Sequence, residues 1–321
     1  MTLTEVVIQQ AITGLSNGLI IALVALGYTM IYGIIELINF AHGDLVMLGS
    51  FAALTALGAC GVHLGPPGSV PWMAVIMLLI VVPLFSAGMN WGIDRLAYRP
   101  LRNAPKLNAL VAAIGVSFVL VNLGLFWGGM PLPGFGGAAA ANASSPKDFP
   151  DLLGYRNLLG DSEVQLTAKD LLVFAITLPL MAGLTWFVTR TRLGTAMRAC
   201  AQDPVAASLM GIDTNRVISA TFALGGALAG VASVVWCLYN NSFSYQMGYR
   251  VGIDAFTAAV LGGIGNLPGA VLGGLVIGLV RAGSDQWIAT AWTNVVVFAV
   301  LIAVLVFRPT GLLGARMREK V

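Results

Sequence analysis

One short polar stretch carries the side chains best suited to chemistry in an otherwise apolar chain. It contains Asn39, His42, Gly43 and Asp44. A His-x-Asp pair supplies two ligands, whereas zinc sites use three or four, and the only other histidine is His63. The chain also lacks HEXXH and acid-rich DDxxD sequences. We therefore expect no catalytic residue, no metal site and no membrane enzyme.

The composition predicts a polytopic membrane protein. Over 321 residues the chain is 58% hydrophobic and 10% charged, whereas soluble domains carry about 25% charged residues. A spanning helix needs about 20 apolar residues, so residues 1–321 allow up to roughly ten crossings within a single transmembrane domain. The cysteines show no CxxC spacing, so we expect no disulfide framework and no zinc site. The predicted fold class is all-α, with eight or nine transmembrane helices, including short broken or re-entrant segments.

Three clusters of Lys and Arg set the predicted orientation. They hold 12 of the 17 basic residues, and short loops rich in these residues stay in the cytoplasm. We therefore place the N-terminus outside and the C-terminus in the cytoplasm, which requires an odd number of crossings. The net charge of +3 indicates topology and weak attraction to membrane lipid, with no nucleic-acid module. The clusters are Arg95/Arg99/Arg102/Lys106, Arg190/Arg192/Arg198/Arg216 and Arg308/Arg316/Arg318/Lys320.

Apolar runs and the polar stretches between them predict the order of spans and loops. The longest polar region, about 129–169, is expected to be an external loop, and residues 190–216 a cytoplasmic loop. Full crossings are expected at residues 11–35, 72–92, 107–127, 170–189, 217–239 and 290–307.

Two further apolar segments are short or broken. Residues 45–58 would form a helix of about 21 Å at 1.5 Å per residue, less than a hydrocarbon core of about 30 Å. Residues 256–279 are interrupted by the sequence GNLPG, which contains Gly265, Asn266 and Pro268, and the half before the break is again short. Paired broken segments in the two halves of a chain indicate a transport pathway near the membrane midplane.

Each break has two interpretations, which can coexist. Polar groups at membrane depth mostly face a cavity or a partner, so Asn39, His42 and Asp44 could line the pathway. Alternatively, Asp44 caps the helix after Gly43, while Asn39 and His42 satisfy backbone groups where the helix breaks. Asn266 is similarly either part of a hinge or part of a simple turn.

The loop at residues 190–216 predicts a short helix on the surface. Asp203 suits the N-cap, Pro204 the first helical position and Gly211 the C-terminal cap, which gives about two turns over 204–210. Val205 and Leu209 are four residues apart and lie on one side of that helix. They form an apolar knob that could fit a groove on a partner. The loop could instead rest on the membrane surface.

Two longer sequences give the chain a family resemblance. GYTMIYGIIELINFAHGDLVMLGSF, residues 27–51, and GIDAFTAAVLGGIGNLPGAVLGGLVIGL, residues 252–279, closely resemble permease subunits of branched-chain amino acid ABC importers of the LivH type. With the loop at 190–216 and the order of the spans, the resemblance extends over nearly the whole chain. It is weakest in the external loop.

The cytoplasmic loop resembles a motif of bacterial ABC importer permeases. Its pattern Ala206-Ala207-x3-Gly211 is similar to their EAA loop, whose short helix docks on an ATPase. Val205 stands where that pattern has Glu, so the match is degenerate. The residues that this resemblance implies in ATPase coupling are Asp203, Pro204, Val205, Ala206, Ala207, Leu209 and Gly211.

The resemblance also implies partners and a location. The chain would be one membrane subunit of an importer in the bacterial inner (plasma) membrane, beside a second permease, two ATPase subunits and a periplasmic or surface substrate-binding protein. No GxxxxGK[ST] occurs in the sequence, so ATP would be hydrolysed by the partner subunits, and this chain would bind no cofactor. The small-xxx-small pairs Gly269/Gly273 and Gly274/Gly278 suit close helix contact, either within the chain or with the second permease.

Several alternatives stay open at this point. The implied substrates are leucine, isoleucine and valine, but related permeases for urea, amides or other amino acids share much of the pattern. The second permease could be a paralogue or another copy of this chain. A secondary transporter or channel would also use broken helices. The docking helix in the loop at 190–216 separates the classes, because a carrier that needs no ATPase has no use for it.

Overall fold

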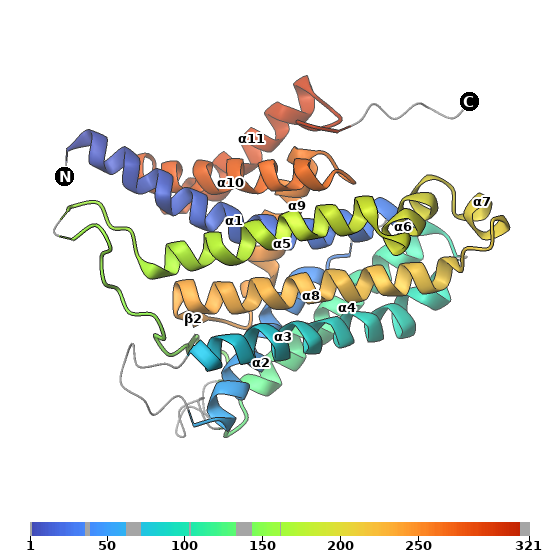
Figure 1. Ribbon diagram of the computed structural model, residues 1–321, viewed down its shortest axis with the longest axis horizontal. Helices are drawn as coiled ribbons and strands as arrows, with labels where there is room; N and C mark the ends of the chain where they lie inside the picture. Colours follow the sequence, from blue (N-terminus) through green and yellow to red (C-terminus); the bar gives the residue numbers. More distant parts are fainter. Residues whose placement is uncertain are drawn as a thin grey trace.

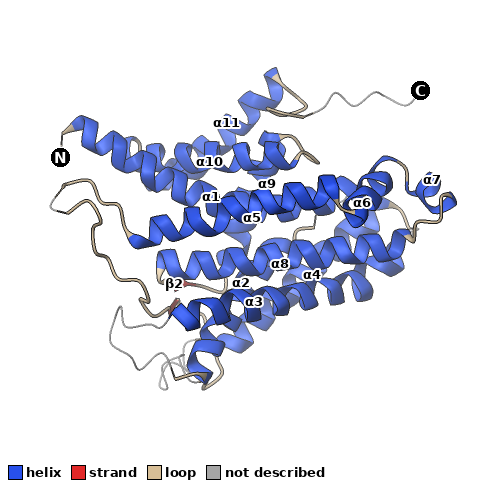
Figure 2. Ribbon diagram, in the orientation of Figure 1, coloured by secondary structure: helices blue, strands red, loops and turns tan. Residues whose placement is uncertain are grey.

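The fold is a bundle of helices that run mainly along its long axis (Figures 1 and 2). The computed structural model describes residues 2–35, 39–61, 72–102, 104–132, 143–160 and 162–314. In this part of the chain, eight helices are long and apolar enough to cross a membrane. A short antiparallel pair joins β1 (Lys147–Asp148) to β2 (Ser242–Phe243). Apart from this two-residue strand pair, the elements of the described chain are helices, so the all-α prediction is confirmed.

The helices follow one another with short connections. In chain order they are α1 (Leu3–Ile35), α2 (His42–Ala59), α3 (Trp72–Ile93), the π-helical turn η2 (Asp94–Tyr98), the 3-10 turn η3 (Arg99–Leu101), α4 (Lys106–Gly128), α5 (Ala168–Arg190), α6 (Arg192–Gln202), α7 (Pro204–Leu209), α8 (Thr214–Asn240), α9 (Met247–Gly262), α10 (Leu267–Trp287), the 3-10 turn η5 (Thr290–Trp292) and α11 (Thr293–Phe307).

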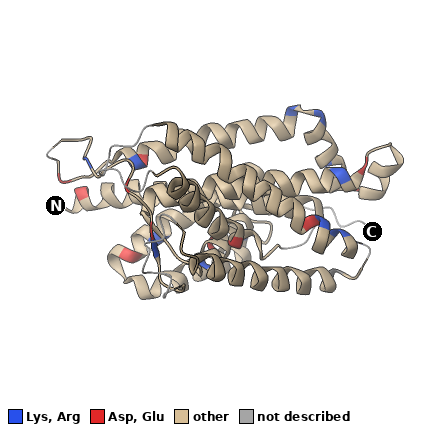
Figure 3. Ribbon diagram, turned by 90° about the horizontal axis from the view of Figure 1, so that it is seen from below, with Lys and Arg blue, Asp and Glu red and all other residues tan. Residues whose placement is uncertain are grey.

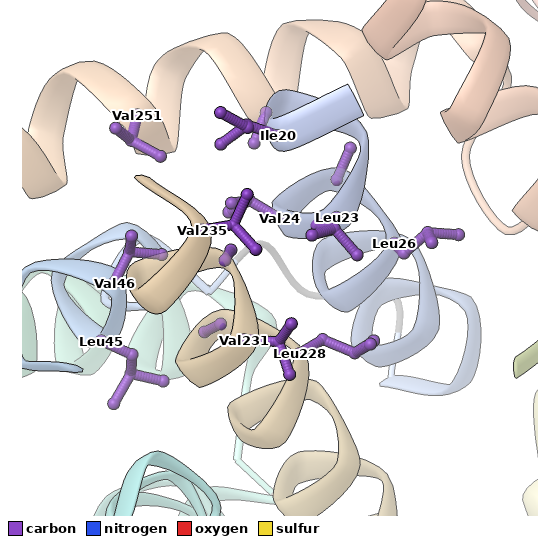
Figure 4. Close-up of a cluster of buried hydrophobic side chains, with 14 of the residues drawn as sticks. Ile20, Leu23, Val24, Leu26, Leu45, Val46, Leu228, Val231, Val235 and Val251 are labelled. Carbon is purple, nitrogen blue, oxygen red and sulfur yellow. The ribbon is translucent and has the colours of Figure 1, made fainter. Parts of the chain in front are cut away.

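Three helices form the centre of the bundle. Over the most apolar 18 residues of α1, α2 and α8, between 72% and 78% of the residues are buried. Figure 4 shows how their side chains meet, with Val24 of α1, Val46 of α2 and Val235 of α8 beside Val251 of α9. In water such helices would be expected only in the core of a large protein. Here the surrounding helices cover them.

Four peripheral helices turn apolar side chains outward. In the corresponding segments of the α3 region, α4, α5 and α11, only 17% to 28% of the residues are buried. Phe118, Trp186 and Val306 are among their large exposed side chains. An apolar exterior of this extent suits lipid or another membrane subunit and does not suit water.

Glycines allow α1 and α10 to pack closely. A Cβ atom at Gly274 would lie 2.7 Å from the Cα atom of Ala22, and one at Gly18 would lie 2.9 Å from the Cα atom of Leu275. Added to Gly273, a Cβ atom would lie 3.0 Å from the backbone nitrogen of Gly262 in α9. The predicted small-residue pairs therefore serve contacts within this chain.

The structure corrects the predicted lengths of two segments. The segment at 45–58 was expected to be too short to span, but α2 begins at His42 and has 18 residues, about 27 Å at 1.5 Å per residue. The helix begins three residues earlier than expected because other helices bury its polar first turn, so these polar residues are not exposed to lipid. Similarly, α9 begins at Met247 inside a stretch that the sequence marks as polar.

The start of α1 lies at the end of the bundle opposite α7 (Figure 1). The odd number of crossings stays a prediction, since eight helices of the described residues are long and apolar enough to span. The end that carries α7 also holds basic residues of the neighbouring helix ends, seen in blue in Figure 3. Arg198 lies on α6 and Arg216 on the first turn of α8, the two helices that contact α7, and Arg95 lies in η2, which contacts α8. Placing this end in the cytoplasm stays a prediction from these charges. Three basic residues of the predicted C-terminal cluster, Arg316, Arg318 and Lys320, lie outside the described residues.

A buried lysine fixes part of the predicted external loop, of which residues 133–142 and 161 lie outside the described chain. Lys169 at the start of α5 donates to Oδ1 of Asn241 at 2.5 Å and pairs with Asp151 at 3.0 Å. Its ammonium group also lies 3.6 Å from the ring centroid of Tyr155. Burial raises the pKa of Asp151, but hydrogen bonds from Lys169 and Asn241 and the charge of Lys169 outweigh burial and hold this pKa below its usual value. The ionised carboxylate thereby anchors the loop to α5 and α8.

Candidate coupling surface and helix breaks

The helix α6 forms the base of the loop that carries the predicted coupling residues. Its N-cap is Thr191, whose hydroxyl accepts a hydrogen bond from the backbone nitrogen of Gly194 at 3.1 Å. Met197 and Cys200 are buried on one side, toward the bundle. The polar side of α6 is left outward, so α6 holds α7 beyond the ends of the long helices (Figure 1).

The start of α7 has the predicted cap. Oδ1 of Asp203 accepts hydrogen bonds from the backbone nitrogens of Val205 at 2.9 Å and Ala206 at 3.0 Å. Pro204 occupies the first helical position, where its missing N–H group has no helical partner to lose. These contacts confirm the local structure that the Asp-Pro sequence predicts.

The end of α7 is closed equally firmly. The backbone nitrogen of Ile212 donates to the carbonyl of Ala207 at 3.1 Å, and that of Gly211 donates to Ser208 at 3.0 Å. This pair of bonds is a Schellman motif, which needs a left-handed residue, and Gly211 has a φ of +83°. The predicted C-terminal cap is thus confirmed.

Both ends being fixed, α7 presents a defined apolar surface. The exposed fractions of Val205, Leu209 and Met210 are 69%, 82% and 84%, whereas Ala207 on the opposite side is 4% exposed. We call the three exposed side chains the α7 knob. Met210 was not predicted from the sequence, because only residues four apart on the helix were considered. Its position directly before the C-cap glycine could have indicated that it belongs to the same apolar surface.

Loss of the Asp203 cap should loosen α7. We expect Asp203→Ala to lower the stability of this helix by about 1 kcal/mol, because the amides of Val205 and Ala206 lose their acceptor. Amide hydrogen exchange at these two residues should become about fivefold faster. Asp203→Asn is the matched control, since its amide oxygen can still cap the helix. Equal acceleration in both variants would show that the carboxylate acts through its charge, and the cap interpretation would be wrong.

The first helix break is a buried polar junction between helices. Asn39 is buried, and its Oδ1 accepts a hydrogen bond from the hydroxyl of Tyr98 at 2.7 Å. His42, also buried, lies edge-on to Tyr28 with 4.8 Å between ring centroids. A Cβ atom at Gly27 would lie 2.6 Å from Cε1 of His42, so the imidazole occupies the space that this glycine leaves.

Asp44 does not cap α2, and that interpretation was wrong. The N-cap is Ala41, without a side-chain hydrogen bond, and Asp44 is already within the helix. Its Oδ2 accepts a hydrogen bond from the hydroxyl of Ser117 at 2.5 Å, which joins α2 to α4. The neighbouring Gly43 packs on α9, where a Cβ atom would lie 2.7 Å from the Cα atom of Gly252. These contacts tie three helices together at the break.

The second break is a capped turn. Gly263 and Gly265 have φ angles of +107° and +85°, which only glycine adopts without strain. Asn266 is the N-cap of α10, because its Oδ1 accepts from the backbone nitrogen of Gly269 at 3.1 Å; its Nδ2 donates to the carbonyl of Leu313 at 2.6 Å. Pro268 lies in the first turn of α10.

The two breaks lie at opposite ends of α9. Gly43 and Asp44 pack beside Gly248 near its start, whereas Gly265 follows its end and lies near Gly33 of α1. The structure therefore does not gather the predicted pathway residues into one site. It uses them to fix both ends of the same helix.

Sequence reasoning treated Arg102 only as a marker of topology. Its Nη2 lies 2.5 Å from the carboxylate of Asp94, and Oδ2 of Asp94 accepts from the hydroxyl of Ser219 at 2.5 Å. Arg102 also donates to Asn215 at 2.5 Å. This network connects the end of α3 to α8 near the α7 end. An acidic residue close to the end of an apolar run was the signal for it.

The described residues contain no group of three His, Cys, Asp or Glu side chains that could hold a metal ion. Of the pair that raised the question, His42 packs against the ring of Tyr28, and Asp44 accepts a hydrogen bond from Ser117. His63 lies outside the described residues.

The chain is thus a polytopic helical bundle with eight helices, among the described residues, that are long and apolar enough to cross a membrane, and a capped helix with an exposed apolar surface at one end. The chain belongs to the family of branched-chain amino acid transport system permease components, which it matches over residues 10–305.

Individual relatives cover almost the full chain. It is 41% identical over 320 residues to the high-affinity branched-chain amino acid transport system permease protein BraD of Pseudomonas aeruginosa, covering 98% of each chain. Identity to the permease protein LivH of the high-affinity system of Escherichia coli K12 is 39% over 320 residues, covering 98% of this chain and 97% of LivH. A probable LivH permease of Methanocaldococcus jannaschii is 27% identical over 309 residues, covering 94% and 90%. No solved structure matches significantly.

Proposed function

We propose that this chain is the transmembrane permease subunit of an ATP-driven importer for leucine, isoleucine and valine. Its membership of a transport permease family supports the membrane role. The names of the relatives that cover nearly the whole chain support the substrate class. We place the protein in the bacterial inner (plasma) membrane as a multi-pass subunit with one transmembrane domain.

The observation that carries the proposal is the α7 knob. Val205, Leu209 and Met210 stand exposed on a helix that is capped at both ends, at the end of the bundle where arginines gather. A helix that presents anchors to a groove is a common mode of recognition. We infer that α7 docks on one of two cytoplasmic ATPase subunits, which bind and hydrolyse ATP in place of this chain.

The remaining partners follow from the same assignment. A second permease, which completes the translocation pathway, would cover part of the apolar exterior of the peripheral helices. A substrate-binding protein would deliver the amino acid at the opposite end from α7. Membrane lipid would cover the rest of the exterior, and no nucleic acid is involved.

The helix breaks have a role in this proposal through α9. Gly43 and Asp44 support its first turns, and Gly265, Asn266 and Pro268 turn the chain at its other end. We propose that these contacts hold α9 in place beside the pathway, while Asn39 and His42 stabilise the junction of α1 and α2 nearby. The earlier expectation that these side chains line the pathway themselves stays a prediction.

Gentle extraction of the tagged chain should recover a complex. We expect two nucleotide-binding subunits and a second permease to co-purify, with ATPase activity in the same sample. Reconstituted with its binding protein, the complex should take up labelled leucine in an ATP-dependent manner, and urea at a rate at least tenfold lower. ATP-dependent uptake of urea in preference to leucine would make the chain a urea or amide permease. An isolated chain that transports without ATP would be a secondary transporter or channel.

A further inference from the structure

A pocket opens beside the start of α9, at the end of the bundle away from α7. Its volume is about 720 Å³, within the range of about 300–1,000 Å³ that is usual for small-molecule sites. The wall is built by α4, α8, α9 and α11, together with the segment around β2. The two predicted helix breaks and the α7 knob contribute no residue to this pocket.

An ion-pair network supports one part of this pocket, in which Asp254 and Asn294 line the pocket and Arg281 lies behind them. Oδ1 of Asp254 lies 2.7 Å from Nη2 of Arg281, which also donates to Oδ1 of Asn294 at 2.8 Å. The network links α9, α10 and α11. Arg281 binds Oδ1 of Asp254 and holds this carboxylate in place, whereas Oδ2 of Asp254 makes no hydrogen bond among the described residues and can face a cationic group of a ligand.

Arg250 adds a positive charge that this network does not compensate. It lines the same pocket and is exposed. Among the described residues it makes no hydrogen bond and no ion pair, although it lies close enough to influence Asp254 electrostatically. A guanidinium group has only donors, in a planar arrangement that matches both oxygens of a carboxylate. The pocket therefore favours a ligand with one carboxylate.

The spacing of the charges suits a zwitterion. Arg250 and Asp254 are four residues apart on α9, so their side chains begin about 5–6 Å from each other on one face. The carboxylate and ammonium groups of an amino acid are attached to the same carbon and can contact the two side chains together. Trp236 of α8, Phe298 of α11 and Val121 of α4 also line the pocket and give it apolar surface.

We propose that this pocket is a subsite for the transported amino acid, with Arg250 binding its carboxylate, Asp254 facing its ammonium group, and Trp236 and Phe298 contacting its branched side chain. The inference rests on the proposed importer function and deepens it. Urea and simple amides are neutral, so they offer Arg250 no counter-ion. Selection for a carboxylate would therefore occur in this chain as well as in the binding protein.

The site can be tested by photolabelling of the assembled importer with its binding protein. A leucine analogue with a diazirine in its side chain should label peptides that contain Trp236 or Phe298. Leucine should compete for labelling at least tenfold better than leucinamide, which lacks the carboxylate. Arg250→Gln should reduce labelling and leucine uptake about tenfold or more, whereas Arg250→Lys, which keeps the charge, should lose clearly less.

Arg156→Gln is the matched control, because Arg156 is exposed in the loop before α5 and outside the pocket. It should label and transport like the wild type. Arg250→Gln should also keep the ATPase stimulation by the loaded binding protein. Wild-type labelling and uptake in Arg250→Gln, or equal competition by leucinamide, would overturn the subsite. If Arg250→Gln were labelled normally but lost the ATPase stimulation, the subsite would also be wrong, because Arg250 would then contact the binding protein and not the amino acid. No leucine uptake by the wild type would refute the importer function itself, together with the subsite.

Discussion

Leu209→Asp is expected to abolish ATP-driven uptake while the chain still folds and inserts. Leu209 is 82% exposed, so the substitution costs the isolated subunit little, in the range of about 0.5 kcal/mol for surface sites. In a docked complex the same side chain would be an apolar anchor at the centre of the α7 knob. Removing such an anchor commonly costs about 2 kcal/mol or more, about thirtyfold in affinity. The measurement is leucine uptake together with the amount of ATPase that co-purifies.

Two further variants isolate the cause of the expected loss. Leu209→Asn removes the apolar side chain without adding charge, and it should also impair uptake and docking. Thr195→Asp places the same negative charge on the exposed side of α6, next to Arg198, which already donates to the Thr195 hydroxyl. That control should transport normally. If Leu209→Asp kept normal uptake with its ATPases bound, the coupling role of α7 would be wrong.

The structure of α7 could be predicted because everything that defines it is local. Asp203 caps amides two and three residues ahead, and Gly211 closes the helix from two residues beyond its end. The same holds for the second break, where Asn266 bonds to Gly269. Capping and left-handed glycines are properties of short sequences, so no knowledge of the rest of the fold was needed.

The first break could not be predicted in the same way, because its contacts cross the fold. Ser117 lies 73 residues from its acceptor Asp44, and Tyr98 lies 59 residues from its acceptor Asn39. Hydropathy also predicted a turn at His42 and Asp44, because both residues count as polar. A hydropathy value contains no information on whether other helices bury a side chain. For the same reason the pocket at Arg250 has no signature in sequence. It depends on four helices that meet only in the folded bundle.

Gly43→Ala is expected to be the most destabilising single-methyl change in the predicted site residues. The added Cβ atom would overlap the carbonyl oxygen of Gly248 and lie 2.7 Å from the Cα atom of Gly252. Both contacts are with the backbone of α9, so no side chain can rotate away, and the two helices must separate. Overpacking of this kind costs about 3 kcal/mol or more, and it would also disturb the adjacent contact of Asp44 with Ser117.

Thermal unfolding of the purified importer in detergent, followed by size-exclusion chromatography, measures this effect. Gly183→Ala in α5 is the matched control, because nothing lies within 4 Å of a Cβ atom there. It should be neutral or slightly stabilising, since alanine favours a helix over glycine by about 1 kcal/mol. A Gly43→Ala protein as stable as Gly183→Ala would show that α2 and α9 are not in close contact. The first helix break would then be free to line the pathway, as the sequence alone allowed, and α9 would need another support for its first turns.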